Sequence, residues 1–586
     1  MRTRRRKAIE TPEMPADKRQ LTVTRVVAAC AIALFVYGPA LTGPFVFDDT
    51  AQFYGRPAEE QPFIAWIGGL RPLLNFSFWL NHLLFGGKPL CYHVVNVVIH
   101  LLNTLLVFLV TRKLLGLYRK STAPQKLNLL AGFAAALFLL HPIQTESVAY
   151  IAGRSETLCA FFMLAALTLF VYHLPGPLTW RPAIGIVLLC AAACATKEQA
   201  VALAPLLLLT DLFWNSDLRL AGLRKNWRLY LPLAAAGLLA GAWVLRILAE
   251  SPTAGFGLRE LTWLQYFFTE CRVFFSYLRL FFLPIGQTVS PDVPLSKSIL
   301  DHGTIFGLIG IIALLAAAVY FRRRYRIASF GIFLFIILLI PTSSFVPLLD
   351  PQAEHRLYLP TLALCLVVVE VMLNVPMRQG QLAAVCVAIS CVCGAMTFSR
   401  NHVWADETLL WNDALSKAPN AERPYLGLSI AYLNQGRCPE AESVLTQLNA
   451  RFERDAQALT LWGRAGECLG KFDEAVDRIT QAAAVTPRAS LYIRIGIIRN
   501  RQRKTQEAIN AFNRAIELDP ISKQAYFLRG QLYEAAARYD AAISDFQRAL
   551  QLPPEDRAVR EHLDRLQQRL RLSGSAPAQG FSRSSN

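Results

Sequence analysis

Apolar runs long enough to form helices recur through residues 24–398, and short polar segments separate them. A helix that crosses a membrane needs about 20 mostly apolar residues. Several of these runs are shorter, so we expect their helices to extend into the flanking polar segments. The pattern predicts eleven membrane spans, at residues 24–42, 92–111, 128–142, 157–173, 182–195, 200–213, 229–248, 304–321, 328–346, 358–375 and 382–398.

The segment TWLQYFFTECRVFFSYLRLFFL, residues 262–283, decides the number of crossings. It is long enough to span, but it carries Glu270, Arg272 and Arg279 at helical spacing. An interfacial or re-entrant amphipathic helix tolerates such charges, whereas a lipid-facing span does not. We therefore expect that it does not cross. With a cytoplasmic N-terminus, eleven spans keep the basic clusters in the cytoplasm, as the positive-inside rule requires, namely Arg112, Lys113, Arg119, Lys120, Arg219, Arg224, Lys225, Arg228 and Arg322–Arg324.

Residues 399–586 are polar and self-similar. The segments GRCPEAESVL, GKFDEAVDRI, RKTQEAINAF and ARYDAAISDF recur every 33–34 residues, which is the period of tetratricopeptide repeats. Small residues recur at the close-packing points, and prolines follow three of the units, at Gly427, Gly463, Gly496, Gly530, Ala441, Ala475, Ala508, Ala542, Pro487, Pro520 and Pro553. Such helix pairs stack into a superhelix whose groove binds extended protein segments. A spacer or a dimerisation module is the alternative.

The fold class predicted is therefore all-α, a polytopic membrane helix bundle followed by an α-solenoid. We expect a basic cytoplasmic N-terminus (1–23), a transmembrane domain (24–398), an extracytoplasmic repeat domain (399–572) and a disordered tail (573–586).

Composition supports this division. The chain has 586 residues, of which 54% are hydrophobic, and a formal net charge of +18. Because the positive charge lies in short clusters between apolar runs, it is typical of a topology signal, and we expect no nucleic-acid partner. Most of the 12 cysteines, such as Cys190 and Cys194, lie in apolar runs and behave as small hydrophobic residues. Cys438 and Cys468 lie in the repeats, where the sequence leaves open whether they pair.

Four polar motifs fall on the extracytoplasmic side of the predicted topology. The first is FVFDDTAQF, in which Asp48 and Asp49 either form a turn or act as a general base, one carboxylate taking a proton while its neighbour holds it or a divalent metal. The amphipathic stretch RPLLNFSFWLNHLLFGG that follows is suited to lie on the membrane surface.

The other three motifs carry charges at the mouths of spans, where charged groups mark function or a buried pair. A cation such as Arg154 or Lys197 could hold the phosphate of a donor. The structural alternatives are that Glu146 and Arg154 neutralise each other and that Lys197–Glu198 is a snorkelling loop pair. The motifs are HPIQTESVAYIAGRSE, with His141, Glu146, Arg154 and Glu156; ATKEQ, with Lys197 and Glu198; and AEHRLYLP, with Glu354, His355, Arg356 and Tyr358.

The chain lacks a Walker loop, a GxGxxG after a strand, an HExxH and a GxSxG. Nucleotide-driven, redox and classical hydrolase functions therefore have no support in the sequence. A transporter is disfavoured because no inverted repeat is visible.

The order of these motifs, from the acidic pair through RPL…FSFWLNHLLFG…YHVVNVVIHLLN and HPIQTESVAYIAGRSE to AEHRLYLP and SRNHVWADETLLWNDALSKAPN, resembles the TMTC-type protein O-mannosyltransferases and their bacterial relatives. These are membrane glycosyltransferases of the GT-C fold with tetratricopeptide repeats, and the resemblance covers almost the whole chain.

The resemblance implies transfer of a sugar, mannose or another hexose, from a polyprenyl-phosphate donor to Ser or Thr hydroxyls of extracytoplasmic proteins, which the repeats bind. It implies that Asp48 and Asp49 are catalytic and that Arg154, Lys197, His355, Arg356 and Tyr358 contact the donor phosphate or substrate, with His141, Glu146, Glu156, Glu198 and Glu354 in support. A divalent metal is the one cofactor candidate, and a bacterial inner membrane is the expected location. The rival hypothesis is a non-enzymatic membrane-anchored scaffold or assembly factor.

Overall fold

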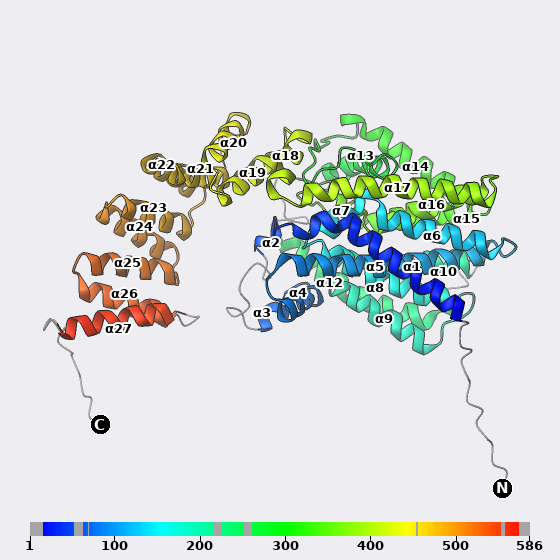
Figure 1. The fold of residues 1–586 in the computed structure, drawn as a ribbon, viewed down its shortest axis with the longest axis horizontal. Coiled ribbons are helices and arrows are strands. Elements are labelled where there is room, and N and C mark those ends of the chain that lie inside the picture. The colour runs from blue at the N-terminus through cyan, green and yellow to red at the C-terminus, as the bar shows by residue number, and fades with distance from the viewer. Residues whose placement is uncertain are drawn as a thin grey trace, which may run out of the picture. The chain divides into compact units, whose positions relative to one another are not determined.

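The structure is a computed structural model that describes residues 16–51, 63–67, 69–215, 219, 224–250, 261–452, 455–552 and 557–572. The described residues form α-helices and short 3-10 helices, and no β-strand occurs among them (Figure 1). The predicted all-α class is therefore confirmed. The chain divides into two compact units, Met1–Ala418 and Pro419–Asn586. The predicted tail, 573–586, lies outside the described residues, as do residues 1–15 of the basic N-terminus.

Unit 1 is a bundle in which helices from distant parts of the sequence pack side by side. Its helices are α1 (Ala16–Tyr37), η1 (Gly38–Thr42), α2 (Asp48–Ala51), α3 (Phe63–Ile67), α4 (Pro72–Phe85), α5 (Pro89–Tyr118), α6 (Pro124–Leu140), η4 (Pro142–Gln144), α7 (Thr145–Ala149), α8 (Arg154–Tyr172), α9 (Trp180–Cys194), η5 (Glu198–Ala202), α10 (Leu203–Trp214), α12 (Trp227–Glu250), α13 (Trp263–Phe282), η6 (Asp301–Gly303), α14 (Thr304–Phe321), α15 (Arg326–Leu339), η7 (Glu354–Leu357), α16 (Pro360–Asn374), α17 (Gln379–Trp404) and α18 (Glu407–Lys417). Several of them, α5, α6 and α16 included, begin on a proline. Proline suits a first helical turn because that position has no intrahelical partner for an N–H.

Four helices of the described chain are long and apolar enough to cross a membrane, or five if the bent pair of 124–140 and 142–149 counts as one. The long helices are 89–118, 154–172, 301–321 and 379–404. Four shorter apolar helices, 26–42, 180–194, 326–339 and 360–374, fall below the length of a straight span. The eleven predicted spans are therefore not confirmed. Helix α13 is not among the candidates, and its predicted place at the interface stays a prediction.

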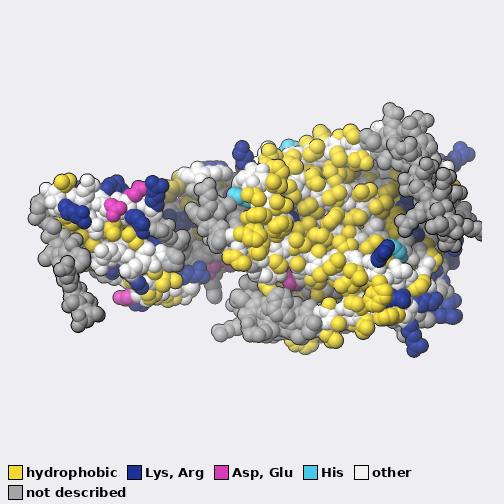
Figure 2. Space-filling view, turned by 90° about the horizontal axis from the view of Figure 1, so that it is seen from below, with side chains coloured by type: hydrophobic (Ala, Val, Ile, Leu, Met, Phe, Trp, Pro, Cys, Tyr) yellow, Lys and Arg dark blue, Asp and Glu magenta, His cyan; other side chains and the backbone are white. Residues whose placement is uncertain are grey.

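One face of unit 1 is largely apolar. Hydrophobic side chains cover the face that Figure 2 shows, with Lys and Arg gathered toward one end. Among the exposed side chains are Phe306, Ile309 and Ile312 on α14 and Leu188 on α9. Soluble proteins rarely expose apolar areas of more than a few hundred Å². Such a surface fits lipid, which supports a membrane protein.

Unit 2 consists of helix pairs, as the repeat pattern predicts. Its helices are α19 (Glu422–Asn434), α20 (Cys438–Arg451), α21 (Ala456–Cys468), α22 (Phe472–Val485), α23 (Ala489–Arg501), α24 (Thr505–Leu518), α25 (Lys523–Ala535), α26 (Tyr539–Gln551) and α27 (Arg557–Leu572). The small residues lie where helices approach closely: a Cβ on Gly496 would come within 2.6 Å of the Phe512 ring, and one on Gly530 within 2.7 Å of Phe546. The alanines at 441, 475, 508 and 542 are fully buried.

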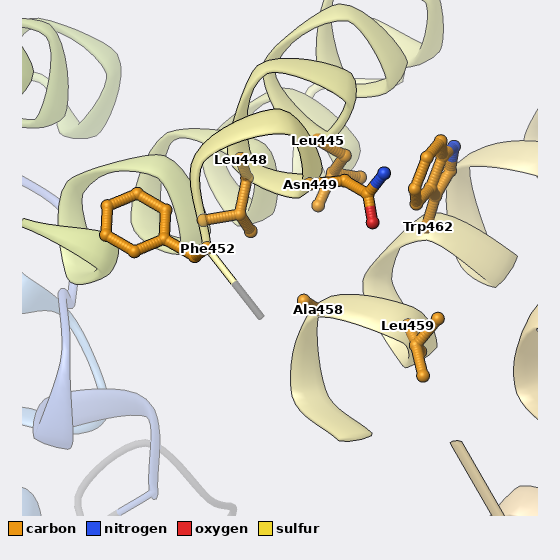
Figure 3. A pocket seen from close by; sticks show the side chains of 7 residues that line it. All are labelled: Leu445, Leu448, Asn449, Phe452, Ala458, Leu459 and Trp462. Carbon is orange, nitrogen blue, oxygen red and sulfur yellow. The ribbon is translucent and has the colours of Figure 1, made fainter. Parts of the chain in front are cut away.

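Two further features of unit 2 lie between neighbouring repeats. Cys438, at the start of α20, forms a disulfide with Cys468, at the end of α21, over a Cα–Cα distance of 6.1 Å. A small pocket lies between the same two helices, lined on one side by Leu445, Leu448, Asn449 and Phe452 and on the other by Ala458, Leu459 and Trp462 (Figure 3). Its lining is almost wholly apolar, so it is a gap in helix packing and not a polar binding site.

The two units divide at 418/419, twenty residues after the domain boundary that the hydropathy pattern predicts. Helix α17 continues to Trp404, and α18 packs with unit 1 through the buried side chains of Leu410 and Trp411. The hydropathy pattern does not show this attachment, because polar residues surround the few apolar residues of α18.

Candidate active site at the polar end of the membrane unit

Unit 1 has one strongly basic end. There the hydroxyl of Tyr118 donates to the carbonyl of Arg324 at 2.6 Å, and the Arg119 guanidinium donates to the Asn374 side chain at 2.9 Å. The Lys126 ammonium donates to the carbonyl of Leu373 at 3.1 Å. These contacts bring the end of α5, the start of α6, the α14–α15 turn and the end of α16 together. The motif that begins at His141 follows the opposite end of α6, and AEHRLYLP precedes the opposite end of α16. The other two motifs contact the first of these, through Asp49 and Ala152 and through Lys197 and Glu156.

Asp49 is a fully buried side chain that joins two of the motifs. Its Oδ1 accepts a hydrogen bond from the backbone N–H of Ala152 at 2.9 Å, and its Oδ2 accepts one from that of Val46 at 3.1 Å. Ala152 belongs to the GRSE turn, about one hundred residues away in the chain. Asp49 therefore holds the loop that follows η1 against that turn.

Asp48 differs from its neighbour because its side chain is exposed. Its backbone N–H donates to the hydroxyl of Tyr150 at 3.1 Å, but its carboxylate forms no hydrogen bond or ion pair in the part of the chain that the structure describes. Phe47, just before it, has a φ of 52°, a left-handed conformation that is uncommon for a residue with a Cβ. Such backbone persists only where the surroundings hold it. The loop thus presents Asp48 to solvent in a constrained geometry.

The turn HPIQTESVAYIAGRSE is built around a break between α6 and α7, which are bent by 48°. The break occurs at His141, because Pro142 cannot donate to the helix. The Nδ1 of His141 accepts from the N–H of Ile143 at 3.2 Å, so its Nε2 donates to the carbonyl of Phe281 at 2.8 Å. Gly153 closes the turn, since a Cβ there would lie 2.6 Å from the carbonyl of Ser147.

Arg154 lies fully buried beneath this turn. Its guanidinium donates to the side-chain oxygens of Asn81 and Asn96, each at 2.8 Å, and to the carbonyl of Tyr92 at 3.0 Å. The Phe78 ring stacks on it, with 4.4 Å from the guanidinium carbon to the ring centroid. Arg154 therefore anchors α4 and α5 to the start of α8. It does not pair with Glu146, the alternative that the sequence left open.

Glu146, Glu156, Lys197 and His355 form what we call the charge cluster. His355 Nδ1 lies 2.6 Å from Glu146 Oε1, and its Nε2 lies 3.9 Å from Glu156 Oε1. The Lys197 ammonium forms an ion pair with Glu156, whose other oxygen accepts from Gln199. Glu156 is 2% exposed, whereas the side chains of His355 and Lys197 are 31% and 14% exposed. The two carboxylates of the cluster are therefore more buried than the side chains of His355 and Lys197.

Arg71 adds a second cation beside the cluster. Its guanidinium donates to both oxygens of Glu198, at 2.9 and 2.8 Å, and 39% of its side chain is exposed. Burial would raise the pKa of the Glu198 carboxyl, but the hydrogen bond and charge of Arg71 outweigh it and hold that pKa below its usual value. Arg71 is not among the site residues predicted from the sequence. It begins the surface stretch RPLLN, and its partner Glu198 lies 127 residues away in the chain.

Glu354 lies directly before His355 and is also buried. Its Oε1 accepts from the backbone N–H of Thr288 at 2.6 Å, and its Oε2 accepts from the Gln287 side chain at 2.9 Å. Burial raises the pKa of this carboxyl to about 7, and the nearby charge of Arg400 opposes the rise while Glu146 adds to it. Glu354 holds η7 to the 287–288 loop.

The remaining predicted residues are embedded in the fold. Arg356 donates to the carbonyl oxygens of Pro351 and Asp350 and so closes the loop before η7. The Tyr358 hydroxyl lies 2.8 Å from His100 Nδ1 and accepts from the Asn103 side chain at 2.9 Å. The hydrogen bonds of both side chains named here are to groups outside the charge cluster. Within the described ranges no group of three or more His, Cys, Asp or Glu side chains is arranged to hold a metal ion.

Comparison with known proteins gives these motifs a context. The tetratricopeptide repeat family matches residues 426–490 and 493–557, which confirms the predicted repeats. The mouse protein O-mannosyl-transferase TMTC3 is 25% identical over 88% of this chain and 62% of its own length. The protein O-mannosyl-transferase F38B6.6 of Caenorhabditis elegans is 24% identical over 73% of this chain and 63% of its own.

Among solved structures, the crystal structure of MamA covers 27% of this chain and 89% of its own, with a TM-score of 0.24 and 23% identity. The chain spans about three-fifths of the length of the two O-mannosyl-transferases. The resemblance inferred from the motifs is confirmed: along most of its length the chain is similar to the TMTC protein O-mannosyl-transferases, and its C-terminal region carries tetratricopeptide repeats.

Proposed function

We propose that this chain is a membrane-integral glycosyltransferase of the GT-C type. It transfers a sugar, mannose or another hexose, from a polyprenyl-phosphate donor to Ser or Thr hydroxyls of extracytoplasmic proteins. The observation that supports it most is the position of Asp48 and the charge cluster at the end of unit 1 that lies opposite the basic end. Basic ends of membrane bundles face the cytoplasm, so the cluster faces outward.

In the proposed reaction, Asp48 takes the proton of the acceptor hydroxyl, and the hydroxyl oxygen forms a bond to the anomeric carbon. The bond between that carbon and the phosphate oxygen breaks, and the electron pair leaves with the polyprenyl phosphate. This single displacement inverts the configuration at the anomeric carbon. An exposed carboxylate is suited to this role because a general base must reach the proton that it removes. Asp49 positions the loop, since both its oxygens already accept backbone hydrogen bonds.

Lys197 and His355 stabilise the leaving phosphate in this proposal. The Lys197 ammonium and the His355 imidazole each pair with a buried carboxylate and are more exposed than that carboxylate. Positive groups fixed beside a developing anion lower the barrier of the transfer step. Arg71 lies beside them at the start of α4. Arg154, Arg356, Tyr358 and His141 are assigned to positioning, because their polar groups bind other parts of the protein.

The lipid part of the donor has a path to this site along α4. Its buried side chains, including Phe78 and Asn81, face Arg154, whereas Leu83, Leu84 and Phe85 are exposed. An amphipathic helix of this kind lies at the membrane surface with its apolar side chains in the acyl region. We infer that the polyprenyl chain stays in the bilayer while its phosphate reaches Arg71 and Lys197.

The test of the function is glycopeptide mass spectrometry of extracytoplasmic proteins from cells with and without the gene. We expect Ser- or Thr-linked hexose to disappear in the deletion strain and to return with the intact gene, but not with an Asp48→Asn copy. Unchanged glycopeptides in the deletion strain would refute the enzymatic proposal. Restoration by the repeats on an unrelated membrane anchor would favour the scaffold hypothesis instead.

The repeats are proposed to lie outside the cytoplasm and to bind the acceptor protein. They come after α17, and this helix ends at the polar end of unit 1. There the ring of Trp404 stacks on that of Tyr150, with 6.0 Å between the ring centroids. A disulfide persists in an oxidising compartment, and the Cys438–Cys468 pair is consistent with that side.

The location of the repeats predicts a labelling pattern. The two repeat cysteines are the only ones after residue 418, and the ten others lie in unit 1. In intact cells or spheroplasts, a membrane-impermeant maleimide should label 438 and 468 only after an external reductant is added. Cys438→Ser provides the control, because it should free Cys468 for labelling without reduction. Labelling that requires permeabilisation would place the repeats in the cytoplasm and contradict the predicted topology.

A further inference from the structure

Helix α18, Glu407–Lys417, lies between the last long helix of unit 1 and the first residue of unit 2 at Pro419. The Asp406 carboxylate caps its start by accepting from the N–H of Leu409 at 2.9 Å. Three of its apolar side chains are buried, Leu410, Trp411 and Ala414, and the first two pack against other parts of unit 1. A simple linker would need neither a cap nor buried anchors. Both ends of this helix contact loops that carry proposed site residues.

The first of these loops is the one that carries Asp48. The Trp411 ring lies 4.3 Å from that of Phe47, centroid to centroid, at an interplanar angle of 48°. Leu410 belongs to the same buried cluster as Val46, whose N–H binds Asp49. Phe47 has the left-handed backbone described above, and the rings of Trp411 and Tyr150 both pack on it, so these two contacts hold the residue that precedes Asp48.

The second loop is the one that carries His355. The Lys417 ammonium lies 2.6 Å from Asp413 Oδ1 and donates to the carbonyl of Gln287 at 2.8 Å. Gln287 in turn donates to Glu354, the residue before His355. Arg400 completes the network through Asp413 Oδ2, at 2.5 Å. A continuous path of hydrogen bonds therefore joins the last residue of α18 to η7.

We propose that α18 is a positioning helix for the transferase site, holding Asp48 through the Trp411–Phe47 contact and His355 through the Lys417–Gln287–Glu354 path. The residues that it positions are the base and a phosphate-binding group, so this inference rests on the proposed function. It assigns a role to the segment that leads into the repeats: the spacing of the two halves of the site depends on α18 being folded against both loops.

The test uses hydrogen exchange on the full-length protein in nanodiscs, with peptides that cover residues 46–49 and 353–357. Trp411→Ala should speed exchange of the first peptide by about tenfold and leave the second unchanged. Lys417→Ala should do the reverse. The conservative variants Trp411→Phe and Lys417→Arg should restore most of the wild-type protection. Lys88→Ala, an exposed lysine at the start of α5, is the matched control and should change neither peptide.

Steady-state kinetics then separate positioning from acceptor binding. Both alanine variants should lower kcat about tenfold at an unchanged KM for the acceptor, because the reacting groups are misplaced while the repeats are intact. Unchanged exchange of both peptides, or faster exchange throughout unit 1 in either variant, would overturn the positioning role. Hydrogen exchange does not depend on catalysis. A wild-type protein that transfers no sugar would therefore refute the proposed function, whereas the exchange of the two peptides alone decides whether α18 positions the two loops.

Discussion

Asp48→Asn should abolish sugar transfer in a protein that still inserts and folds. A positioned general base contributes about 10²–10⁴-fold to a rate, and the amide cannot accept the hydroxyl proton. The side chain is exposed, and its carboxylate has no partner among the described residues, so the substitution removes no internal hydrogen bond. The measurement is transfer from a synthetic polyprenyl-phosphate sugar to an acceptor protein, alongside thermal unfolding in detergent.

Two other aspartates make this result interpretable. Asp49→Asn replaces one of two oxygens that accept backbone N–H groups, so it should lower the unfolding temperature as well as the rate. Asp292→Asn changes an exposed aspartate of a neighbouring loop and should alter neither. If Asp48→Asn retains wild-type activity while Asp49→Asn folds normally and is inactive, the base is Asp49, and the assignment made from exposure is wrong.

Lys197→Met should destabilise unit 1 strongly and also remove activity. Glu156 is almost fully buried, and Lys197 is its ion-pair partner. Removing one partner of a buried pair leaves an uncompensated charge and costs about 3–5 kcal/mol. The variant also loses the cation assigned to the leaving phosphate. Chemical or thermal unfolding of the purified protein measures the first effect, and single-turnover transfer measures the second.

A double variant separates the two consequences. Glu156→Gln combined with Lys197→Met removes both charges, so most of the lost stability should return. Activity should not return, because no cation replaces Lys197 above the site. Lys88→Met, which changes an exposed lysine outside the cluster, controls for loss of positive charge at this end of the bundle. Recovery of transfer in the double variant would show that Lys197 serves only to neutralise Glu156.

The fold was predictable from the sequence where the signal is local and periodic. Repeats of 33–34 residues, with glycine at each close-packing point, specify helix pairs whatever else the chain contains, and Gly496 and Gly530 lie against Phe512 and Phe546 as that pattern requires. Basic clusters likewise predicted a single basic end, because topology depends on which loops carry Lys and Arg. The number of spans was less accessible, since several apolar helices are short and one is broken at His141.

The sequence also defined the polar motifs as groups, but it could not determine which of their side chains are buried and which are exposed. Asp48 and Asp49 are chemically identical neighbours, and only packing against Ala152 separates the buried one from the exposed one. The sequence is compatible with Arg154 as a phosphate ligand, but in the structure its guanidinium donates to the side chains of Asn81 and Asn96.

Partners of this kind lie tens to hundreds of residues apart, as His355 and Glu146 do, and no periodicity in the chain records them. The sequence by itself determined the all-helical architecture, the tetratricopeptide repeats and the polar motifs, because hydropathy and repeat spacing are properties of neighbouring residues. Only the tertiary structure decided which charges are accessible, which are enclosed, and that α18 belongs to the membrane unit, because burial and pairing are properties of packed helices.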